Sequence, residues 1–188
     1  MKDNLLILGS GGHGQVVREI AQAMGIFQEI NHLDDNSTDS HTIGKLEDYK
    51  IFRREYGYAI AAFGINSYRM GWLKKLEELE YKLIPIIHPK AFLSPTAKVL
   101  EGTVIEAGAL INTGVTIGKG CIIGLGSIVD HNAEIHEGCH IDSGVVVRAN
   151  SIIKRESRIS LWKSERTSYR GQIMAVSSIE NYSFEDGV

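Results

Sequence analysis

Aliphatic side chains recur at every sixth position through the second half of the chain. An α-helix repeats its apolar positions every three to four residues and a half-buried strand every second residue, so neither element accounts for a period of six. A coil of short strands does, with the aliphatic side chains pointing inward. These inward positions are Ile87, Leu93, Val99, Ile105, Ile111, Ile117, Ile123, Val129, Ile135, Ile141, Val147, Ile153 and Ile159.

Two other positions of the repeat favour the same architecture. Four residues after an inward position comes a small one: Ala91, Ala97, Thr103, Ala109, Val115, Cys121, Ser127, Ala133, Cys139, Val145, Ser151 and Ser157. Directly before it stands a residue type that readily takes a positive φ: Gly102, Gly108, Gly114, Gly120, Gly126, Asn132, Gly138, Gly144 and Asn150. Each unit therefore carries its own turn. Three units predict one triangular turn of eighteen residues, and about four turns stack into a parallel β-helix.

The first part of the chain follows a different pattern. Residues 5–8 predict a short buried strand, and a glycine turn separates them from residues 16–24, whose apolar side chains have helical spacing. A second strand ending at Leu33, a third over 59–63 and a second helix over 68–79 complete the prediction. This is a small Rossmann-like βαβ arrangement.

The two patterns divide the chain into two domains and a tail. We expect a small α/β domain over residues 1–84 and the β-helix over residues 85–159. The repeat then fails, because the next small position is Lys163, the next inward position is Glu165, and Trp162 does not fit a narrow core. Residues 160–188 are interpreted as an atypical tail or a cap on the last turn, whose edge needs cover.

Composition and charge exclude several classes of protein. The 188 residues are 43% hydrophobic, enough for a real core, and the net charge of −3 with scattered Lys and Arg argues against a nucleic-acid partner. The apolar run near the N-terminus is too short to span a membrane and lacks a signal cleavage pattern, so we expect a cytoplasmic protein without a membrane span. Cys121 and Cys139 form no CxxC pair and are interpreted as packing residues of the core.

A glycine motif suggests a nucleotide site in the first domain. Gly9, Gly11 and Gly14 form GxGxxG between a predicted strand and helix, and two aspartates, Asp34 and Asp35, follow about twenty residues later. A domain of this size holds only half of a dinucleotide fold. We therefore expect one nucleotide, with its phosphates at the helix N-terminus and its ribose near Asp34. A glycine turn that merely permits close packing remains the alternative.

Longer runs carry a resemblance to a known family. ILGSGGHG, HLDDN, FGINSYR, IIHPKAFLSPTA and INTGVTIGKGCIIGLGSIVDHNAEIHEGCHI resemble the bacterial sugar acetyltransferases that include UDP-4-amino-sugar N-acetyltransferases and sialic acid O-acetyltransferases. The resemblance covers residues 1 to roughly 155. It implies a left-handed β-helix, acetyl-CoA as co-substrate, and a homotrimer whose active sites lie between neighbouring subunits. It also implies a sugar-nucleotide site in the first domain, to which we assign Gly11, Gly12, His13, Gly14, Asp34, Asp35, Gly64, Asn66 and Arg69.

The same resemblance assigns the catalytic corner. It places the general base at His131, within the run Asp130, His131 and Asn132, and histidine titrates near neutrality as such a base must. Related proteins commonly have an acidic residue where this chain has Asn132, so Asp130 is expected to take over part of that role. His140 matches a histidine near the acetyl group and the pantetheine arm, and Ala149 a position whose backbone lines the CoA cleft.

We therefore predict acetyl transfer from acetyl-CoA to an amino sugar, specifically a UDP-linked 4-amino-4,6-dideoxy sugar. The alternatives are a sialic acid or other sugar O-acetyltransferase, and a non-catalytic nucleotide-sugar-binding trimer that has lost CoA binding. A zinc site like that of the γ-class carbonic anhydrases, which share this β-helix, would need a third histidine beside His131 and His136. The corresponding position is Pro95, so no metal is expected.

Overall fold

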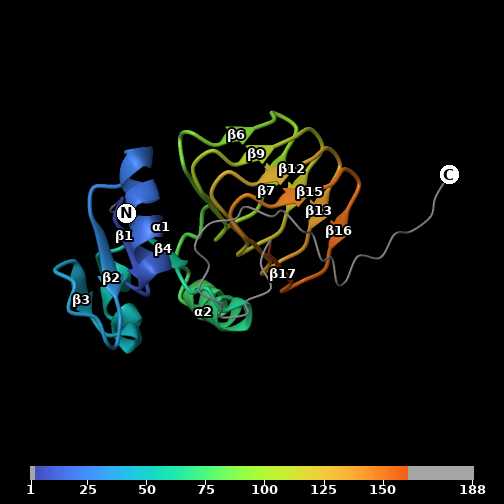
Figure 1. The fold of residues 1–188 in the computed structure, drawn as a ribbon. Coiled ribbons are helices and arrows are strands. Elements are labelled where there is room, and N and C mark those ends of the chain that lie inside the picture. Colours follow the sequence, from blue (N-terminus) through green and yellow to red (C-terminus); the bar gives the residue numbers. More distant parts are fainter. Residues whose placement is uncertain (1–2, 161–188) are drawn as a thin grey trace, which may run out of the picture.

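The computed structural model describes residues 3–160, which form a small α/β domain followed by a β-helix (Figure 1). All but the first residue of the segment interpreted as a tail or cap lies outside the described residues. Between residues 3 and 160, no helix is long and apolar enough to cross a membrane.

A parallel four-stranded sheet forms the first domain, with the strand order β3-β2-β1-β4. Its elements are β1 (Leu5–Leu8), α1 (Gly12–Met24), β2 (Ile30–Leu33), β3 (Thr42–Gly44), two 3-10 helices (Leu46–Lys50 and Phe52–Arg54), β4 (Tyr58–Ala61) and α2 (Asn66–Glu78). The central strand β1 is apolar at all four positions because both of its faces are covered. Leu5 and Ile7 pack in the cluster that contains α1, and Leu6 and Leu8 in the cluster that contains α2.

Up to residue 160, where the described part of the chain ends, the β-helix has thirteen two-residue strands, as the six-residue period predicts. They lie in three parallel sheets, which we call sheets I, II and III. Sheet I contains β5 (Ile86–Ile87), β8 (Val104–Ile105), β11 (Ile122–Ile123), β14 (His140–Ile141) and β17 (Arg158–Ile159). Sheet II contains β6 (Phe92–Leu93), β9 (Leu110–Ile111), β12 (Ile128–Val129) and β15 (Val146–Val147). Sheet III contains β7 (Lys98–Val99), β10 (Thr116–Ile117), β13 (Glu134–Ile135) and β16 (Ile152–Ile153).

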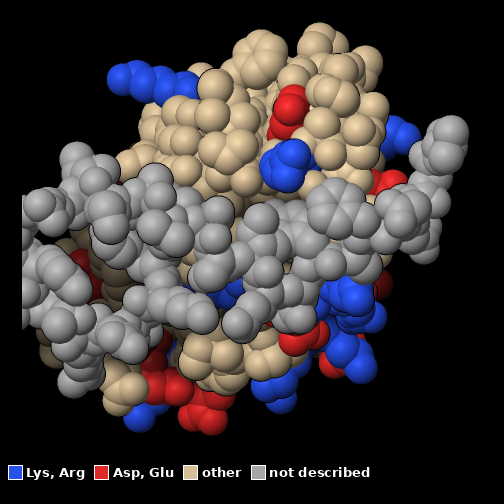
Figure 2. Space-filling view, turned by 45° about the vertical axis from the view of Figure 1, so that its right-hand side comes forward, with Lys and Arg blue, Asp and Glu red and all other residues tan. Residues whose placement is uncertain are grey.

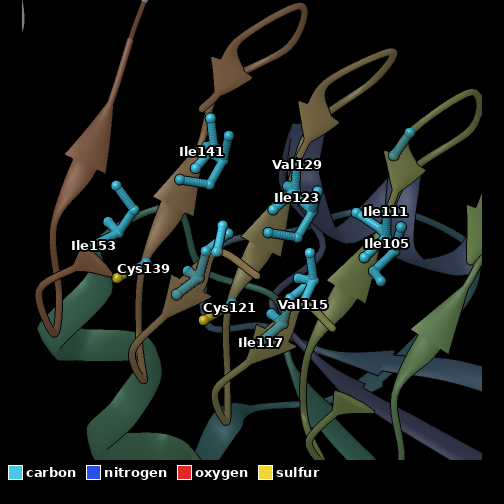
Figure 3. Packing of buried hydrophobic residues seen from close by; sticks show 14 of the residues in the cluster. Ile105, Ile111, Val115, Ile117, Cys121, Ile123, Val129, Cys139, Ile141 and Ile153 are labelled. Atoms are coloured by element: carbon cyan, nitrogen blue, oxygen red, sulfur yellow. The ribbon is translucent and has the colours of Figure 1, made fainter. Parts of the chain in front are cut away.

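The core of the β-helix is the predicted stack of inward side chains (Figure 3). Each inward residue pairs with the one eighteen positions away, for example Ile117 with Ile135. Cys121 and Cys139 occupy the small position on adjacent coils, and both are buried free thiols. Their Sγ atoms donate to the carbonyl oxygens of His136 and Lys154, so they act as small packing residues with satisfied polar hydrogens.

From Gly102 onward, the turn position of each unit takes the left-handed conformation. The predicted glycines from Gly102 to Gly144 have positive φ, as do Asn132 and Asn150. The structure adds Glu156, with a φ of 56°, one residue type that the glycine and asparagine pattern did not include. For a glutamate this conformation costs on the order of 1 kcal/mol. Asn66 of α2 donates to the carbonyl oxygen of this residue at 2.8 Å, a contact that helps to offset the cost.

The outward faces of the three sheets differ in character. On sheet I, Ile86, Val104 and Ile122 are buried, the first two in the cluster that contains α1. The outward column of sheet III is mixed. On sheet II, the outward side chains are all apolar and 38–56% exposed; they are Phe92, Leu110, Ile128 and Val146. Figure 2 agrees, since its upper part, where β9, β12 and β15 lie in Figure 1, presents few charged side chains.

Helix α2 joins the two domains along the corner between sheets III and I. Leu73 packs against the Cα positions of Gly102 and Gly120, where a Cβ would lie 2.5–3.0 Å from its methyl groups. The guanidinium of Arg69 is fully buried beside these turns and donates to the carbonyl oxygens of Gly120, at 2.8 Å, and Gly138, at 2.9 Å. Burial of a charged group is tolerable here because its donors are hydrogen-bonded.

The aliphatic stack predicts that substitutions at inward and outward positions of sheet III differ greatly in their effect on the melting temperature. Ile135→Asp places an unpaired carboxylate inside the β-helix, at a cost of several kcal/mol, and should abolish soluble protein or lower the melting temperature by more than ten degrees. Ile152→Asp, on the partly exposed outward column of sheet III, is the matched control and should melt within a few degrees of wild type. Thermal unfolding followed by circular dichroism measures both. Equal effects of the two substitutions would contradict the inward assignment.

Candidate active site

The predicted site residues gather at two different corners of the β-helix. The glycine loop before α1 lies against the corner between sheets I and II, where His13 faces Glu106. His131 lies at the next corner, between sheets II and III, because it follows β12 and precedes β13. Within one chain, the outward face of sheet II therefore separates the nucleotide-binding candidates from the candidate base.

The glycine loop contains glycines of two kinds. A Cβ on Gly14 would lie 2.2 Å from the carbonyl oxygen of Gly9, and Gly9 has a φ of 100°, so packing and backbone conformation require both glycines. Gly11 and Gly12 are exposed, and a Cβ on either would meet no atom within 4 Å. Packing and backbone conformation within the chain therefore explain two of the three motif glycines, but not Gly11. The bare surface at Gly11 and Gly12 leaves room for a ligand to approach the backbone.

The N-terminus of α1 is open to an anion. Gly11 is its N-cap and supplies no side-chain hydrogen bond, and the first turn contains no acidic residue. The N–H groups of this turn and the positive end of the helix dipole suit a phosphate. This is the place at which the sequence motif predicts the phosphates of a nucleotide.

The two aspartates after β2 are anchored on backbone N–H groups. Asp34 accepts from Ser10 at 2.8 Å and from Asn36 at 2.9 Å, which ties the glycine loop to the end of β2. Partial burial would raise the pKa of Asp34, but these hydrogen bonds together hold it below its ordinary value. Asp35 is exposed and accepts from the N–H of Leu46.

The structure brings His13 and His140 to the same side of the β-helix. Burial, the neighbouring His140 and Arg69 lower the pKa of His13 to about 4, so its ring is neutral at pH 7. Burial also lowers the pKa of His140, although Asp142, 3.2 Å from its Nε2, opposes the shift. Nε2 of His13 and Nδ1 of His140 are buried without a hydrogen-bond partner. A ligand that reaches these nitrogens could supply the missing hydrogen bonds.

Glu106 is a member of this site that sequence reasoning missed. Its carboxylate lies 3.9 Å from Nδ1 of His13 and accepts from the N–H of Leu125 at 3.0 Å. The only sequence signal was its register, eighteen residues before Gly124 and thirty-six before Asp142. Its partner His13 is 93 positions away in the chain, so the pairing depends on how the two domains pack.

Three residues assigned to the sugar nucleotide lie at or near the domain junction. Arg69 has no exposed surface, and its donors contact backbone carbonyls of both domains and the side-chain oxygen of Asn66. Asn66 in turn donates to the carbonyl oxygens of Glu156 and Ser157. Gly64 is exposed next to this contact, and a hydrogen bond with its backbone opposes the lowering of the pKa of His140 by burial. The geometry gives Arg69 and Asn66 a joining role.

The corner that carries His131 is polar and exposed. Asp130 accepts from the N–H of His131 at 2.7 Å and from Asn112 at 2.9 Å, and these bonds hold the pKa of Asp130 below its ordinary value. Asn132 has the left-handed conformation, and its Nδ2 lies 3.4 Å from Nδ1 of His131. The partner of the imidazole is thus an amide, while the carboxylate of Asp130 is bound to the backbone.

The next coil of the β-helix has a small side chain at the corner position that follows His131. Ala149 stands eighteen residues after His131, and the N–H of the following Asn150 donates to the carbonyl oxygen of His131 at 3.0 Å. The small side chain of Ala149 leaves the imidazole uncovered on this side, which suits the passage of a narrow, flexible arm such as pantetheine. Over residues 3–160 there is no group of three or more His, Cys, Asp or Glu side chains that could hold a metal ion.

Comparison with known proteins identifies the family of the chain. The family described as the PglD N-terminal domain matches residues 4–76. The solved acetyltransferase domain of PglB from Neisseria gonorrhoeae FA1090, in complex with acetyl coenzyme A, is 33% identical, with a TM-score of 0.81 over 85% of this chain and 80% of that one. The chain belongs to the sugar acetyltransferase family.

Other members of the sugar acetyltransferase family are more distant or match over a shorter length. UDP-N-acetylbacillosamine N-acetyltransferase of Bacillus subtilis (strain 168) is 34% identical over 112 residues, and the chain spans about half the length of this curated relative. A GDP-perosamine N-acetyl transferase from Caulobacter crescentus, solved with CoA and GDP-perosamine, has 24% identity and a TM-score of 0.63. The latter likeness concerns the fold alone.

The buried, neutral state of His13 predicts a pH-dependent stability. In the unfolded chain His13 takes up a proton near pH 6.5, but in the folded chain only near pH 4. Its contribution to stability is therefore complete above pH 6.5 and is lost as the pH falls toward 4. Between pH 7 and 4, we expect the free energy of unfolding of His13→Gln to fall less than that of wild type, by on the order of 3 kcal/mol.

Denaturant unfolding at the two pH values measures this difference. NMR titration of the His13 ring provides a direct check, with the exposed His136 as internal control. A His13 resonance that titrates near 6.5, or parallel pH dependences for the variant and wild type, would contradict the assignment.

Proposed function

We propose that this protein transfers the acetyl group of acetyl-CoA to the amino group of a nucleotide-linked sugar. The observation that carries the proposal is the similarity, over most of the chain, to an acetyltransferase domain solved with acetyl coenzyme A. The exposed His131 on the β-helix supplies a candidate base for that chemistry. The name of the Bacillus subtilis relative, which refers to UDP-N-acetylbacillosamine, supports a UDP-linked amino sugar as acceptor, and we propose a 4-amino-4,6-dideoxy sugar.

In this mechanism the protein holds two substrates and moves one proton. Acetyl-CoA supplies the activated acyl group, and its thiol is the leaving group. His131 removes a proton from the acceptor amine while the nitrogen attacks the thioester carbonyl carbon, so a C–N bond forms as the C–S bond breaks. Asn132 orients the imidazole through Nδ1, and Asp130 fixes the backbone of the corner. His140 and Ala149 are proposed to line the path of the pantetheine arm.

The first domain is proposed to hold the nucleotide. The free N–H groups after Gly11 and Gly12 receive the phosphates at the N-terminus of α1, and Asp34 and Asp35 lie beside the ribose. The open surface at Gly11 and Gly12 supports this placement. His13 then lies between the phosphates and the β-helix, where the sugar would extend.

Sheet II is proposed as the interface of a homotrimer. Its outward column is apolar along the whole β-helix, whereas the N-terminal domain covers sheet I and the column of sheet III contains Lys98 and Glu134. A second copy of the chain is the occupant that also completes the site, because His13 and His131 lie at opposite edges of this sheet. Packing across sheet II would bring His131 of one copy toward the nucleotide site of its neighbour.

Loss of His131 should abolish catalysis without loss of fold. His131 is exposed and makes no core contact, so His131→Ala should leave the melting temperature nearly unchanged and lower turnover by roughly a hundred to ten thousand times. Acetyl transfer to a UDP-4-amino sugar, followed by CoA release, measures the effect. His136→Ala removes another exposed histidine of the β-helix and should retain full turnover.

Two outcomes would overturn this assignment. Wild-type rates in the His131 variant would remove the histidine from the mechanism. If wild type acetylated no amino or hydroxyl sugar but bound sugar nucleotides, the protein would be a non-catalytic binding protein. Transfer to a hydroxyl sugar alone would favour the O-acetyltransferase.

The apolar column of sheet II predicts the oligomeric state. Light scattering should give three times the chain mass of 20.7 kDa, and Leu110→Glu should dissociate the trimer because it places a charge at the centre of the interface. Thr116→Glu, on the outward column of sheet III, is the control and should remain trimeric. A monomeric wild type would contradict both the trimer and the shared active site.

A further inference from the structure

The carboxylate of Glu106 is largely buried, and the contacts within the fold satisfy only one of its two oxygens. Its side chain is 16% exposed, at the corner between sheets I and II, directly under the glycine loop. One carboxylate oxygen accepts the N–H of Leu125. The other lies 3.9 Å from Nδ1 of His13, which is too long for a hydrogen bond.

No cation compensates this carboxylate among residues 3–160. None of the ion pairs there joins Glu106 to a lysine or an arginine, and His13 is neutral at pH 7 because burial lowers its pKa to about 4. Burial raises the pKa of Glu106, while the N–H of Leu125 opposes the shift. A half-satisfied carboxylate in a low-dielectric site favours any cation that reaches it.

A neighbouring polar atom is an acceptor as well. If the Nδ1–H of His13 points to Glu106, Nε2 is left as an acceptor, and this atom is buried without a partner. His140 offers no comparable acceptor, because the backbone of Gly64 and the carboxylate of Asp142 both favour its protonated ring. Around Glu106 the site therefore presents one carboxylate and one acceptor nitrogen. It suits a group that carries several donors and a positive charge.

We infer that Glu106 and His13 receive the amino group of the acceptor sugar in its ammonium form. The ammonium group then loses one proton to solvent, and the neutral amine that results attacks the thioester and gives a second proton to His131. The inference rests on the proposed function, since it takes the ligand to be a nucleotide-linked sugar, and it deepens that function by selecting an amine over a hydroxyl acceptor. An ammonium group offers three donors and a charge, whereas a hydroxyl offers one donor and no charge.

A phosphate is a poor occupant of this position. The carboxylate of Glu106 would repel it, and the N-terminus of α1 offers unpaired N–H groups nearby. The two positions would bind different parts of the substrate. The phosphates would lie at the N-terminus of α1, and the amino sugar at the corner between sheets I and II. A purely structural role for Glu106 as acceptor for Leu125 predicts no preference between sugars.

Binding without acetyl-CoA tests the inference independently of catalysis. The probes are UDP, a UDP-linked 4-amino-4,6-dideoxy sugar and the same nucleotide sugar with a 4-hydroxyl group, each measured by calorimetry. Wild type should bind the amino sugar about tenfold to a hundredfold more tightly than the hydroxyl sugar, the range expected for a charged hydrogen bond. Glu106→Gln should bring this ratio close to one and leave the affinity for UDP unchanged.

Two variants serve as controls for fold and charge. Glu106→Gln keeps an oxygen that can accept the N–H of Leu125, so its melting temperature should match that of wild type. Glu134→Gln removes an exposed carboxylate of sheet III and should keep the wild-type preference.

The outcomes separate this inference from the proposed function. Equal binding of both sugars by wild type, or a preference that survives in Glu106→Gln, overturns the role of Glu106 while the acetyltransferase proposal stands. If neither UDP-linked sugar binds, the UDP-sugar acceptor that both proposals assume is wrong.

Discussion

The narrow interior of the β-helix is the constraint from which the rest of the arrangement follows. A triangular coil with six residues per side admits only one aliphatic and one small side chain per unit, and it stacks them in one continuous buried cluster. The polar side chains that do fit inside are the small hydroxyls of Thr103, Ser127 and Ser151. All chemistry is therefore confined to the corners and outward columns, where side chains such as Glu106 and His131 stand at regular intervals.

The corners of the β-helix make different contacts because different residue types stack along each of them. The corner between sheets III and I presents bare glycine turns, against which Leu73 packs and into which Arg69 donates. This contact holds the first domain against sheet I and thereby fixes the glycine loop over Glu106. Loss of the hydrogen bonds of Arg69 is therefore expected to change the position of His13, at the opposite edge of sheet I, because both residues belong to the first domain.

The β-helix was predictable because its information is local and repeated. Each unit specifies its own turn and inward residue, so an exception such as Glu156 does not change the prediction. The short strand β3 and the two 3-10 helices were missed, since their few residues have no clear period and depend on contacts made elsewhere. The corner at His131 followed from the resemblance.

The first domain shows where sequence reasoning ends. Its glycine motif located a candidate anion site. The family resemblance, however, grouped Arg69 with the ligand-binding residues. Only the packing of α2 on the coils shows that its guanidinium is taken up by carbonyl oxygens. Glu106 illustrates the converse, because an acidic residue on a repeat is unremarkable until a loop from the other domain buries it.

The separation of His13 from His131 has a consequence for how binding and catalysis are connected. The proposed nucleotide site lies at the glycine loop of one chain, among α1, β2 and sheet I. The proposed base, His131, lies beyond sheet II, so the proposed mechanism requires a neighbouring copy to present it to that ligand. Under this proposal, binding is a property of the single chain and transfer a property of the assembly. Dissociation of the copies would then leave nucleotide affinity intact and remove turnover. A substitution at Asn132 would instead alter turnover and leave both the nucleotide affinity and the assembly unchanged.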